Sequence, residues 1–172
     1  FGAGLASIGD VDQDGFDDIL ISNDKTSYLL YGQAANYDNP TSATNPTSSA
    51  VAEISVAVGY STVAAAGDFN GDGVSDFAVG DPGATFANTG SGGAYIVYGD
   101  AGAPLDQVSL PALDSSAAAI FSGGGFSESA SGFHGLASAG DINGDGYSDI
   151  LMSSYTKVGA DGQSGVVYVG FG

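Results

Sequence analysis

An 18-residue segment that occurs three times constrains the fold of this chain more than any other feature of its sequence. The repeats begin at Leu5, Val63 and Leu136 and align without gaps. They read LASIGDVDQDGFDDILIS, VAAAGDFNGDGVSDFAVG and LASAGDINGDGYSDILMS, and the first and third are identical at 11 of 18 positions. Because an internal repeat marks a repeated supersecondary unit, the chain is predicted to consist of three similar units.

Short apolar runs around each repeat predict β-strands. Small or apolar residues precede each Gly-Asp pair, and a run such as Asp-Ile-Leu-Ile follows each loop. An element with the pattern Tyr-x-x-Tyr/Phe-Gly comes later, at 28–32, 95–99 and 168–172. Further strands are predicted at 51–58 and 117–122. Since no stretch shows a helical apolar period bounded by caps, the chain is predicted to be all-β, in units of about four short strands.

Each repeat contains a nine-residue loop with the pattern D-x-[DN]-x-D-G-x-x-D. Side-chain oxygens at positions 1, 3 and 5 can converge on one ion, glycine at position 6 permits the sharp turn, and the position 7 carbonyl and the position 9 aspartate complete the set. Calcium prefers about six to eight hard oxygen ligands, whereas magnesium needs a tighter octahedron and is the second choice. The predicted metal ligands are Asp10, Asp12, Asp14, Phe16 and Asp18, then Asp68, Asn70, Asp72, Val74 and Asp76, then Asp141, Asn143, Asp145, Tyr147 and Asp149, with Phe16, Val74 and Tyr147 acting through their carbonyls.

Two other interpretations of these loops are less consistent with the sequence. An EF-hand requires an acidic residue at position 12, where this chain has Ile21, Val79 and Met152 inside strand-like runs. Ordinary Asp/Asn-Gly hairpin turns would explain one loop but not three with the same carboxylate spacing, because clustered carboxylates repel one another without a cation. The sequence therefore predicts about three bound Ca²⁺ ions.

The charge of the chain excludes several classes of partner. Its 172 residues include 20 acidic and only two basic residues, Lys25 and Lys157, which gives a formal charge of −18. Such a surface repels phosphate backbones and anionic lipids, so binding to nucleic acid or to a membrane surface is not expected, and membrane insertion is not expected either. No apolar run approaches the ~20 residues of a membrane helix. The absence of cysteine excludes disulfides and thiolate sites. The chain begins at Phe1 without a signal peptide, which favours a mature or excised segment.

The residues available for catalysis are few. His134 is the only histidine, and it lies next to a predicted junction between units, where a packing or loop role is expected rather than catalysis. No G-x-S-x-G motif occurs, and there is no arginine to bind a phosphate or carboxylate. The aspartates of the three loops are assigned to metal. The other aspartates are numerous enough to supply a carboxylate pair for glycoside hydrolysis, but they lie in turn-rich stretches where solvated loop residues are expected. The chain is therefore predicted not to be an enzyme.

The repeats resemble a known family. The Phe1-Gly2 pair, the Gly-Asp loops and the Tyr-x-x-Tyr-Gly elements are similar to the FG-GAP repeat of integrin α-subunit β-propellers, and the sequence AGDINGDGYSD at 139–149 is specific for it. The chain looks closer still to FG-GAP proteins that bacteria export. The GAP element survives only as Gly80-Asp81-Pro82. The resemblance implies that each repeat is a four-stranded propeller blade whose calcium loop joins the two innermost strands.

This resemblance divides the chain into one propeller segment, residues 1–172, with three blades. Blade 1 is expected at about 1–58, blade 2 at about 59–122 and blade 3 at about 133–172, the last without an outer strand. The segment is thus an arc of a larger or assembled propeller. Other blades, or further copies of the protein, are expected to cover its open faces and edges.

The function expected from these features is that of a calcium-binding, non-catalytic propeller module, secreted or at the cell surface, that serves adhesion or scaffolding. Its ligand would be an extracellular protein or glycan. In integrins, ligands meet the face opposite the calcium loops, which here points to 81–92 and 155–164. One alternative is a self-assembling structural subunit of an extracellular oligomer or filament. Another is an accessory propeller of a secreted hydrolase.

Overall fold

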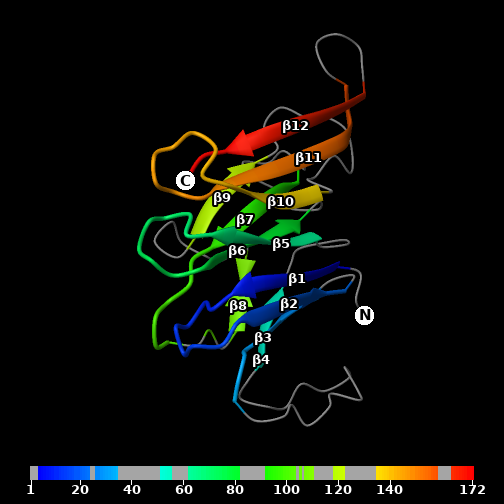
Figure 1. Ribbon diagram of the computed structural model, residues 1–172. Coiled ribbons are helices and arrows are strands. Elements are labelled where there is room, and N and C mark those ends of the chain that lie inside the picture. The colour runs from blue at the N-terminus through cyan, green and yellow to red at the C-terminus, as the bar shows by residue number, and fades with distance from the viewer. Residues whose placement is uncertain are drawn as a thin grey trace.

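The computed structural model describes residues 4–23, 26–34, 51–55, 62–81, 92–103, 105, 107–110, 118–122, 135–158 and 164–172. The strands in these segments form three sheets, which follow one another along the molecule (Figure 1). No helix that could cross a membrane occurs in these segments. The predicted all-β fold is confirmed.

The first sheet has five strands in the spatial order β1-β2-β3-β4-β8. They are β1 (Gly4–Gly9), β2 (Asp18–Ser22), β3 (Thr26–Leu30), β4 (Val51–Ser55) and β8 (Gln107–Ser109). The first four pair antiparallel, whereas β8 runs parallel to β4. The hairpin β1-β2 contains the first Asp-Gly loop.

The second and third sheets begin with the same hairpin. The second has the order β5-β6-β7-β9 and the third the order β10-β11-β12. Their strands are β5 (Thr62–Gly67), β6 (Asp76–Asp81), β7 (Gly93–Val97), β9 (Ala118–Ser122), β10 (Gly135–Gly140), β11 (Asp149–Val158) and β12 (Ser164–Gly170). All the pairs in these two sheets are antiparallel. Both β4 and β9 lie within the two stretches, 51–58 and 117–122, where further strands are predicted.

A register shift occurs at the same place in all three hairpins. It lies two residues before the loop, between Ser7 and Gly9 in the first hairpin, and it brings Gly9 opposite Asp18. The equivalent pairs are Gly67 with Asp76 and Gly140 with Asp149. A bulge of this kind re-aims the chain, and here it turns the first strand into the loop.

Strand β8 joins the first sheet although it follows β7 of the second sheet in the chain. A tyrosine anchors this crossing: the hydroxyl of Tyr31 accepts a hydrogen bond from the Leu105 N–H at 2.6 Å and donates one to the Leu105 carbonyl at 3.3 Å. Val108 and Leu110 then enter the core of the first sheet. The first and second sheets are therefore fastened by a strand as well as by packing.

Two hydrophobic clusters fill the spaces between the sheets. One joins the first and second sheets and the other joins the second and third. Strand β6 supplies both, because its side chains alternate: Phe77 and Val79 belong to the first cluster, and Ala78 belongs to the second. Every residue of β6 and β7 is buried. The middle sheet is thus covered on both faces.

Candidate metal centres

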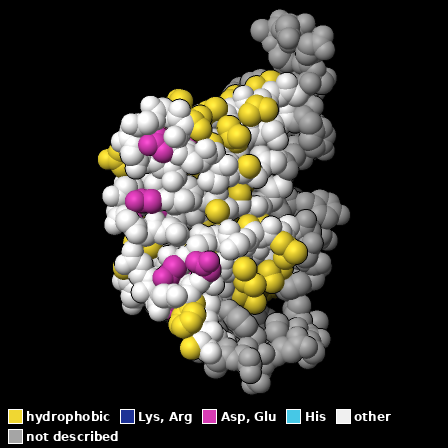
Figure 2. All heavy atoms as spheres, viewed as in Figure 1, with side chains coloured by type: hydrophobic (Ala, Val, Ile, Leu, Met, Phe, Trp, Pro, Cys, Tyr) yellow, Lys and Arg dark blue, Asp and Glu magenta, His cyan; other side chains and the backbone are white. Residues whose placement is uncertain are grey.

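The three Asp-Gly loops lie along one edge of the molecule. Each joins the first two strands of its sheet, and Figure 1 shows all three projecting on the same side. Acidic side chains gather along this edge (Figure 2). All fifteen residues predicted as metal ligands belong to these loops and lie within the described segments.

One hydrogen-bond scheme organises each loop. In the second loop, the Gly73 N–H donates to Asp68 Oδ2 at 3.0 Å, the Asp72 N–H to Asn70 Oδ1 at 3.0 Å, and the Val74 N–H to Asp72 Oδ1 at 2.8 Å. The corresponding bonds in the first and third loops measure 2.9–3.2 Å. Position 6 needs a glycine, since φ there is 87° in the second loop, a conformation that other residues rarely adopt. The scheme turns the side chains of positions 1, 3 and 5 into the loop.

The second loop leaves one oxygen unsatisfied. Asp68 Oδ1 is buried and has no hydrogen-bond partner among the described residues. A buried carboxylate oxygen without a partner is costly, because it has lost its hydration and gained nothing in exchange. A cation held by this loop would satisfy that oxygen, so the donor set fits a hard metal ion.

The first loop has the densest group of carboxylates. Ligand oxygens of Asp10, Asp12 and Asp18 lie within 4.8 Å of one another. Burial raises the pKa of the Asp12 carboxyl, and the charges of Asp14 and Asp10 raise it further. This arrangement is unfavourable for three anions and favourable around a divalent cation.

The second and third loops differ from the first at position 3. There an asparagine replaces Asp12, and its amide donates to the position 5 carboxylate: Asn70 Nδ2 to Asp72 Oδ2, and Asn143 Nδ2 to Asp145 Oδ2, both at 2.8 Å. The amide relieves part of the repulsion, so these two loops do not bring three carboxylates as close together as the first loop does. Asparagine still offers a carbonyl oxygen, which is a suitable calcium ligand.

The position 9 aspartates are buried anchors. Asp18, Asp76 and Asp149 are fully buried, and in each the Oδ2 atom accepts the position 2 N–H at 2.8 Å. The Oδ1 atom accepts an N–H from the glycine that ends the Tyr-x-x-Tyr/Phe-Gly element of the same sheet. These bonds run from Gly32 at 2.6 Å, from Gly99 at 2.9 Å and from Gly172 at 3.2 Å.

The sequence pattern predicts position 9 only as a metal ligand. It does not predict that the same carboxylate accepts a hydrogen bond from the glycine after the third strand. The signal that could have revealed it is the glycine that ends all three aromatic elements. Each position 9 carboxylate ties its loop to the third strand of its sheet. An ion bound in the loop and the packing of that sheet are therefore coupled through one side chain.

Two repeat families match this sequence. The FG-GAP-like repeat matches residues 10–79 and the FG-GAP repeat matches residues 135–169, so together they span more than half of the chain. The chain belongs to the FG-GAP repeat family. No curated protein matches it. The resemblance is confirmed at the level of the family and of its β-propeller blades, whereas the closer likeness to integrins or to exported bacterial proteins stays a prediction.

In the FG-GAP blades of this chain, the glycine after the aromatic element passes directly over the loop. A Cβ atom on Gly32 would lie 2.6 Å from the Asp17 carbonyl oxygen, and one on Gly172 would lie 2.6 Å from the Ser148 carbonyl oxygen. A Cβ atom on Gly99 would likewise overlap the Ser75 carbonyl oxygen, and it would lie 2.7 Å from the Val11 carbonyl oxygen. Only glycine fits these positions without moving the backbone.

Gly99→Ala is therefore expected to destabilise the protein by about 2–3 kcal/mol, because the methyl group meets backbone atoms of two FG-GAP loops that cannot rotate away. Gly135→Ala is the matched control, since the nearest atom there, at 2.6 Å, is the Ser153 hydroxyl, which ends a short side chain. Urea unfolding monitored by circular dichroism measures both. Equal stabilities of the two variants would contradict the close approach described for Gly99.

Successive FG-GAP loops also contact one another. The Gln13 amide donates to the Gly73 carbonyl at 2.9 Å, and the Ser148 N–H donates to the Asp68 carbonyl at 2.9 Å. The turn after β7 donates to the first loop, with Gly102 N–H bonded to the Asp12 carbonyl at 2.6 Å. Each pair of successive blades is thus joined by a hydrogen bond between their loops.

The remaining predicted features lie mostly outside the described segments. His134 is not described, nor are 82–91 and 159–163 within the two ranges expected to contact a ligand. The Asp81 residue of the degenerate GAP element ends β6 and is fully buried.

Proposed function

We propose that this chain is a calcium-binding, non-catalytic β-propeller module of an extracellular or cell-surface protein, used for adhesion or scaffolding. The observation that carries the proposal is the buried, unpartnered Oδ1 atom of Asp68, inside a loop whose hydrogen-bond scheme is repeated in all three blades. Calcium supplies the missing partner, and its preference for carboxylate, amide and carbonyl oxygens matches positions 1, 3, 5, 7 and 9.

Electrostatics supports a divalent cation at each loop. The first loop holds five aspartates, and the sequence has only two lysines, neither of which lies in any of the three loops. Three calcium ions would offset six of the eighteen net negative charges, at the places where the carboxylates are closest together. Because the position 9 carboxylate is also hydrogen-bonded to the glycine after the third strand, a bound ion would stabilise that strand as well.

A structural rather than a catalytic role follows from the same residues. The loop carboxylates are taken up by backbone N–H groups and by the proposed ion, which leaves them unavailable as general acids or bases. FG-GAP repeats occur in extracellular and cell-surface proteins, where calcium is abundant. We therefore assign the protein to a scaffold that presents other surfaces to an extracellular protein or glycan.

The direct test is calcium titration by calorimetry on the metal-free chain. We expect about three equivalents for the unaltered protein and about two for Asp72→Ala, which removes the position 5 ligand of one loop. Glu53→Gln is the control, because Glu53 is exposed on β4 and lies outside the loops, and it should keep three equivalents. A flat titration of the unaltered chain would refute the proposal.

The pH dependence of calcium binding tests the position 9 ligand. Burial raises the pKa of the Asp76 carboxyl from 3.8 to about 6, against the opposing effect of its N–H donors. Calcium binds the carboxylate form, so a proton competes with it below that pH. The affinity of the second loop should fall about tenfold for each pH unit below 6, with release of a proton on binding.

Titrations at pH 7 and pH 5 measure this effect. In the metal-free protein the sign is reversed, because a raised pKa favours the protonated folded state: the part of the stability that depends on protonation of Asp76 is fully present below its ordinary pKa of 3.8 and is lost as the pH rises through about 6. A calcium affinity that is the same at pH 5 and pH 7 for all three sites would contradict the assignment of Asp76 as a ligand.

A further inference from the structure

The chain makes the same junction between blades twice, and it leaves both halves of a third junction open. We call the side of a sheet that faces the preceding sheet its leading face, and the side that faces the next sheet its trailing face. Phe77 and Val79 lie on the leading face of the second sheet, and Ile150 and Met152 on that of the third. Among the strands that the structure describes, none forms a sheet against the leading face of the first sheet or against the trailing face of the third (Figure 1).

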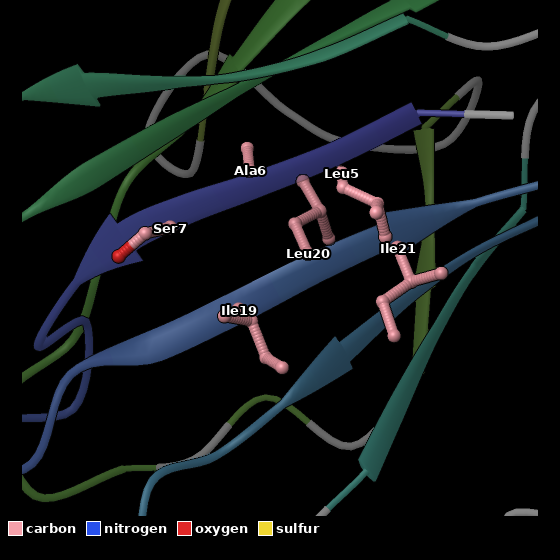
Figure 3. A pocket seen from close by; sticks show the side chains of 6 residues that line it. All are labelled: Leu5, Ala6, Ser7, Ile19, Leu20 and Ile21. Carbon is pink, nitrogen blue, oxygen red and sulfur yellow. The ribbon is translucent and has the colours of Figure 1, made fainter. Parts of the chain in front are cut away.

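On the leading face of the first sheet, apolar residues stand where the inner blades have buried ones. Ile19 is the repeat equivalent of Phe77 and Ile150; its exposed fraction is 40%, whereas those two are fully buried. Leu5 is 71% exposed. Figure 3 shows Ile19 and Ile21 projecting from the same side of β2, with Leu5 beside Ile21, its partner in the sheet. These residues line one shallow hollow.

The trailing face of the third sheet shows the complementary exposure. Val167 and Val169 of β12 are 65% and 42% exposed, whereas their equivalents in the second blade, Ala94 and Ile96, are fully buried. Ile142 is exposed as well, although its equivalent Phe69 is buried in the core between the second and third sheets. Hydrophobic side chains gather over β1-β2 and over β11-β12 in Figure 2.

The loops at the two open faces match each other in a more specific way. At the junction of the second and third sheets, the ring of Tyr147 at position 7 lies against Gly71 at position 4 of the preceding loop, so closely that a Cβ on Gly71 would overlap the ring. At the junction of the first and second sheets, position 4 is Gln13 and position 7 is the smaller Val74, and Gln13 instead bonds the Gly73 carbonyl. A glycine is thus paired with an aromatic residue, and a larger residue with a smaller one.

The two open ends carry the glycine and the aromatic residue. Position 4 of the third loop is Gly144, with open space where a Cβ would lie, and position 7 of the first loop is Phe16, 40% exposed. Gly140 is likewise open, whereas its equivalents Gly9 and Gly67 are packed against Ser75 and Ser148 at position 8 of the next loop. The exposed halves of the third junction are therefore the counterparts of contacts already made inside the chain.

From this complementarity we propose that the trailing face of the third sheet docks on the leading face of the first sheet in a second copy of this chain. Phe16 of one copy would lie on Gly144 of the other, and Leu5, Ile19 and Ile21 would pack against Val167 and Val169. The contact is heterologous, so it generates a ring if the rotation closes and a filament if it does not. It rests on the blade faces and does not depend on which metal the loops hold.

One residue of the leading face opposes this contact. Position 8 of the first loop is Asp17, where the inner loops have serine, so a carboxylate would be brought against Gly140. Burial of an unpaired charge at an interface weakens association. Asp17→Ser should restore the inner arrangement and lower the dissociation constant of the assembly by about tenfold.

Sedimentation velocity of the 172-residue chain in calcium, at about 10–100 µM and at physiological salt, tests the proposal. The unaltered chain should form a ring or filament that dissociates on dilution. Leu5→Glu blocks the leading face and Val167→Glu blocks the trailing face, and each should sediment as a monomer. Both sites are exposed in a single copy, so the thermal unfolding of the monomers should be unchanged. Ala101→Glu lies in the exposed turn that follows β7 of the second sheet, outside the residues named for either face, so it adds the same charge and should assemble normally.

A mixture of the two blocked variants gives the decisive result. The trailing face of Leu5→Glu and the leading face of Val167→Glu remain intact, so the mixture should form a 1:1 complex and stop there. Non-specific association of exposed apolar surface would not show that stoichiometry. A monomeric unaltered chain, or a mixture that remains monomeric, would overturn the proposal and assign these faces to a blade from a different protein or segment.

Discussion

Removal of calcium is expected to lower the melting temperature of this protein by about 20 °C. A site held at a free calcium concentration 100 times its dissociation constant stabilises the folded state by about 2.7 kcal/mol, so three sites contribute about 8 kcal/mol. That is comparable with the whole stability of an ordinary domain, about 5–15 kcal/mol. For a chain of this length, 1 kcal/mol corresponds to about 2–4 °C. Thermal unfolding followed by circular dichroism, in calcium and in EGTA, measures the difference.

The loss should spread beyond the loops because the loops are joined to the sheets. Hydrogen bonds connect the second loop to the third through Asp68 and Ser148, and the position 9 aspartates connect each loop to its third strand. Magnesium is the control: its smaller octahedral shell fits these loops poorly, so magnesium at the same concentration should restore only a small part of the loss. A change below about 2 °C in EGTA would show that the hairpins are stable as turns without an ion.

Those parts of the fold that depend on local pattern could be predicted from the sequence. The three hairpins, their loops and the strands β4 and β9 follow from apolar runs separated by Asp-Gly turns, and each of these signals lies within about ten residues. The position 12 residues Ile21 and Val79 lie in strands, where neither could serve as the last ligand of an EF-hand. Local spacing is sufficient because each loop is formed by consecutive residues.

Contacts between distant segments could not be predicted in this way. Strand β8 is only three residues long, and it pairs with β4 just after the Tyr31–Leu105 hydrogen bonds, which join residues 74 positions apart. The pairing of Asp76 with Gly99 spans 23 positions, and the contact of Tyr147 with Gly71 joins two blades. These contacts depend on how the sheets are placed relative to one another, and the repeat pattern alone does not specify that placement. The same placement makes position 9 an anchor as well as a predicted ligand.

Asp76→Ala should be more damaging than the loss of any other single loop carboxylate in the second blade. The Asp76 side chain is fully buried and accepts hydrogen bonds from the N–H groups of Phe69, Asn70 and Gly99, at 2.8, 3.3 and 2.9 Å. Alanine would leave these donors without their acceptor in the interior. A hydrogen bond to a charged group is worth about 1.5–3 kcal/mol, so a loss of about 3–5 kcal/mol is expected.

Comparison with Asp72→Ala separates the two roles of Asp76. Asp72 is exposed and lies in the same loop, so both variants lose one proposed ligand and should bind about two calcium ions. In EGTA, where no ion contributes, Asp72→Ala should lose less than about 1 kcal/mol, while Asp76→Ala should keep most of its deficit. Urea unfolding at about 10 °C of the unaltered protein and of both variants, each with and without calcium, provides the six free energies. If the two variants are equally stable in EGTA, position 9 acts through the ion alone. If the deficit of Asp76→Ala persists, the carboxylate that binds the metal also holds the third strand, and the blade depends on it in both states.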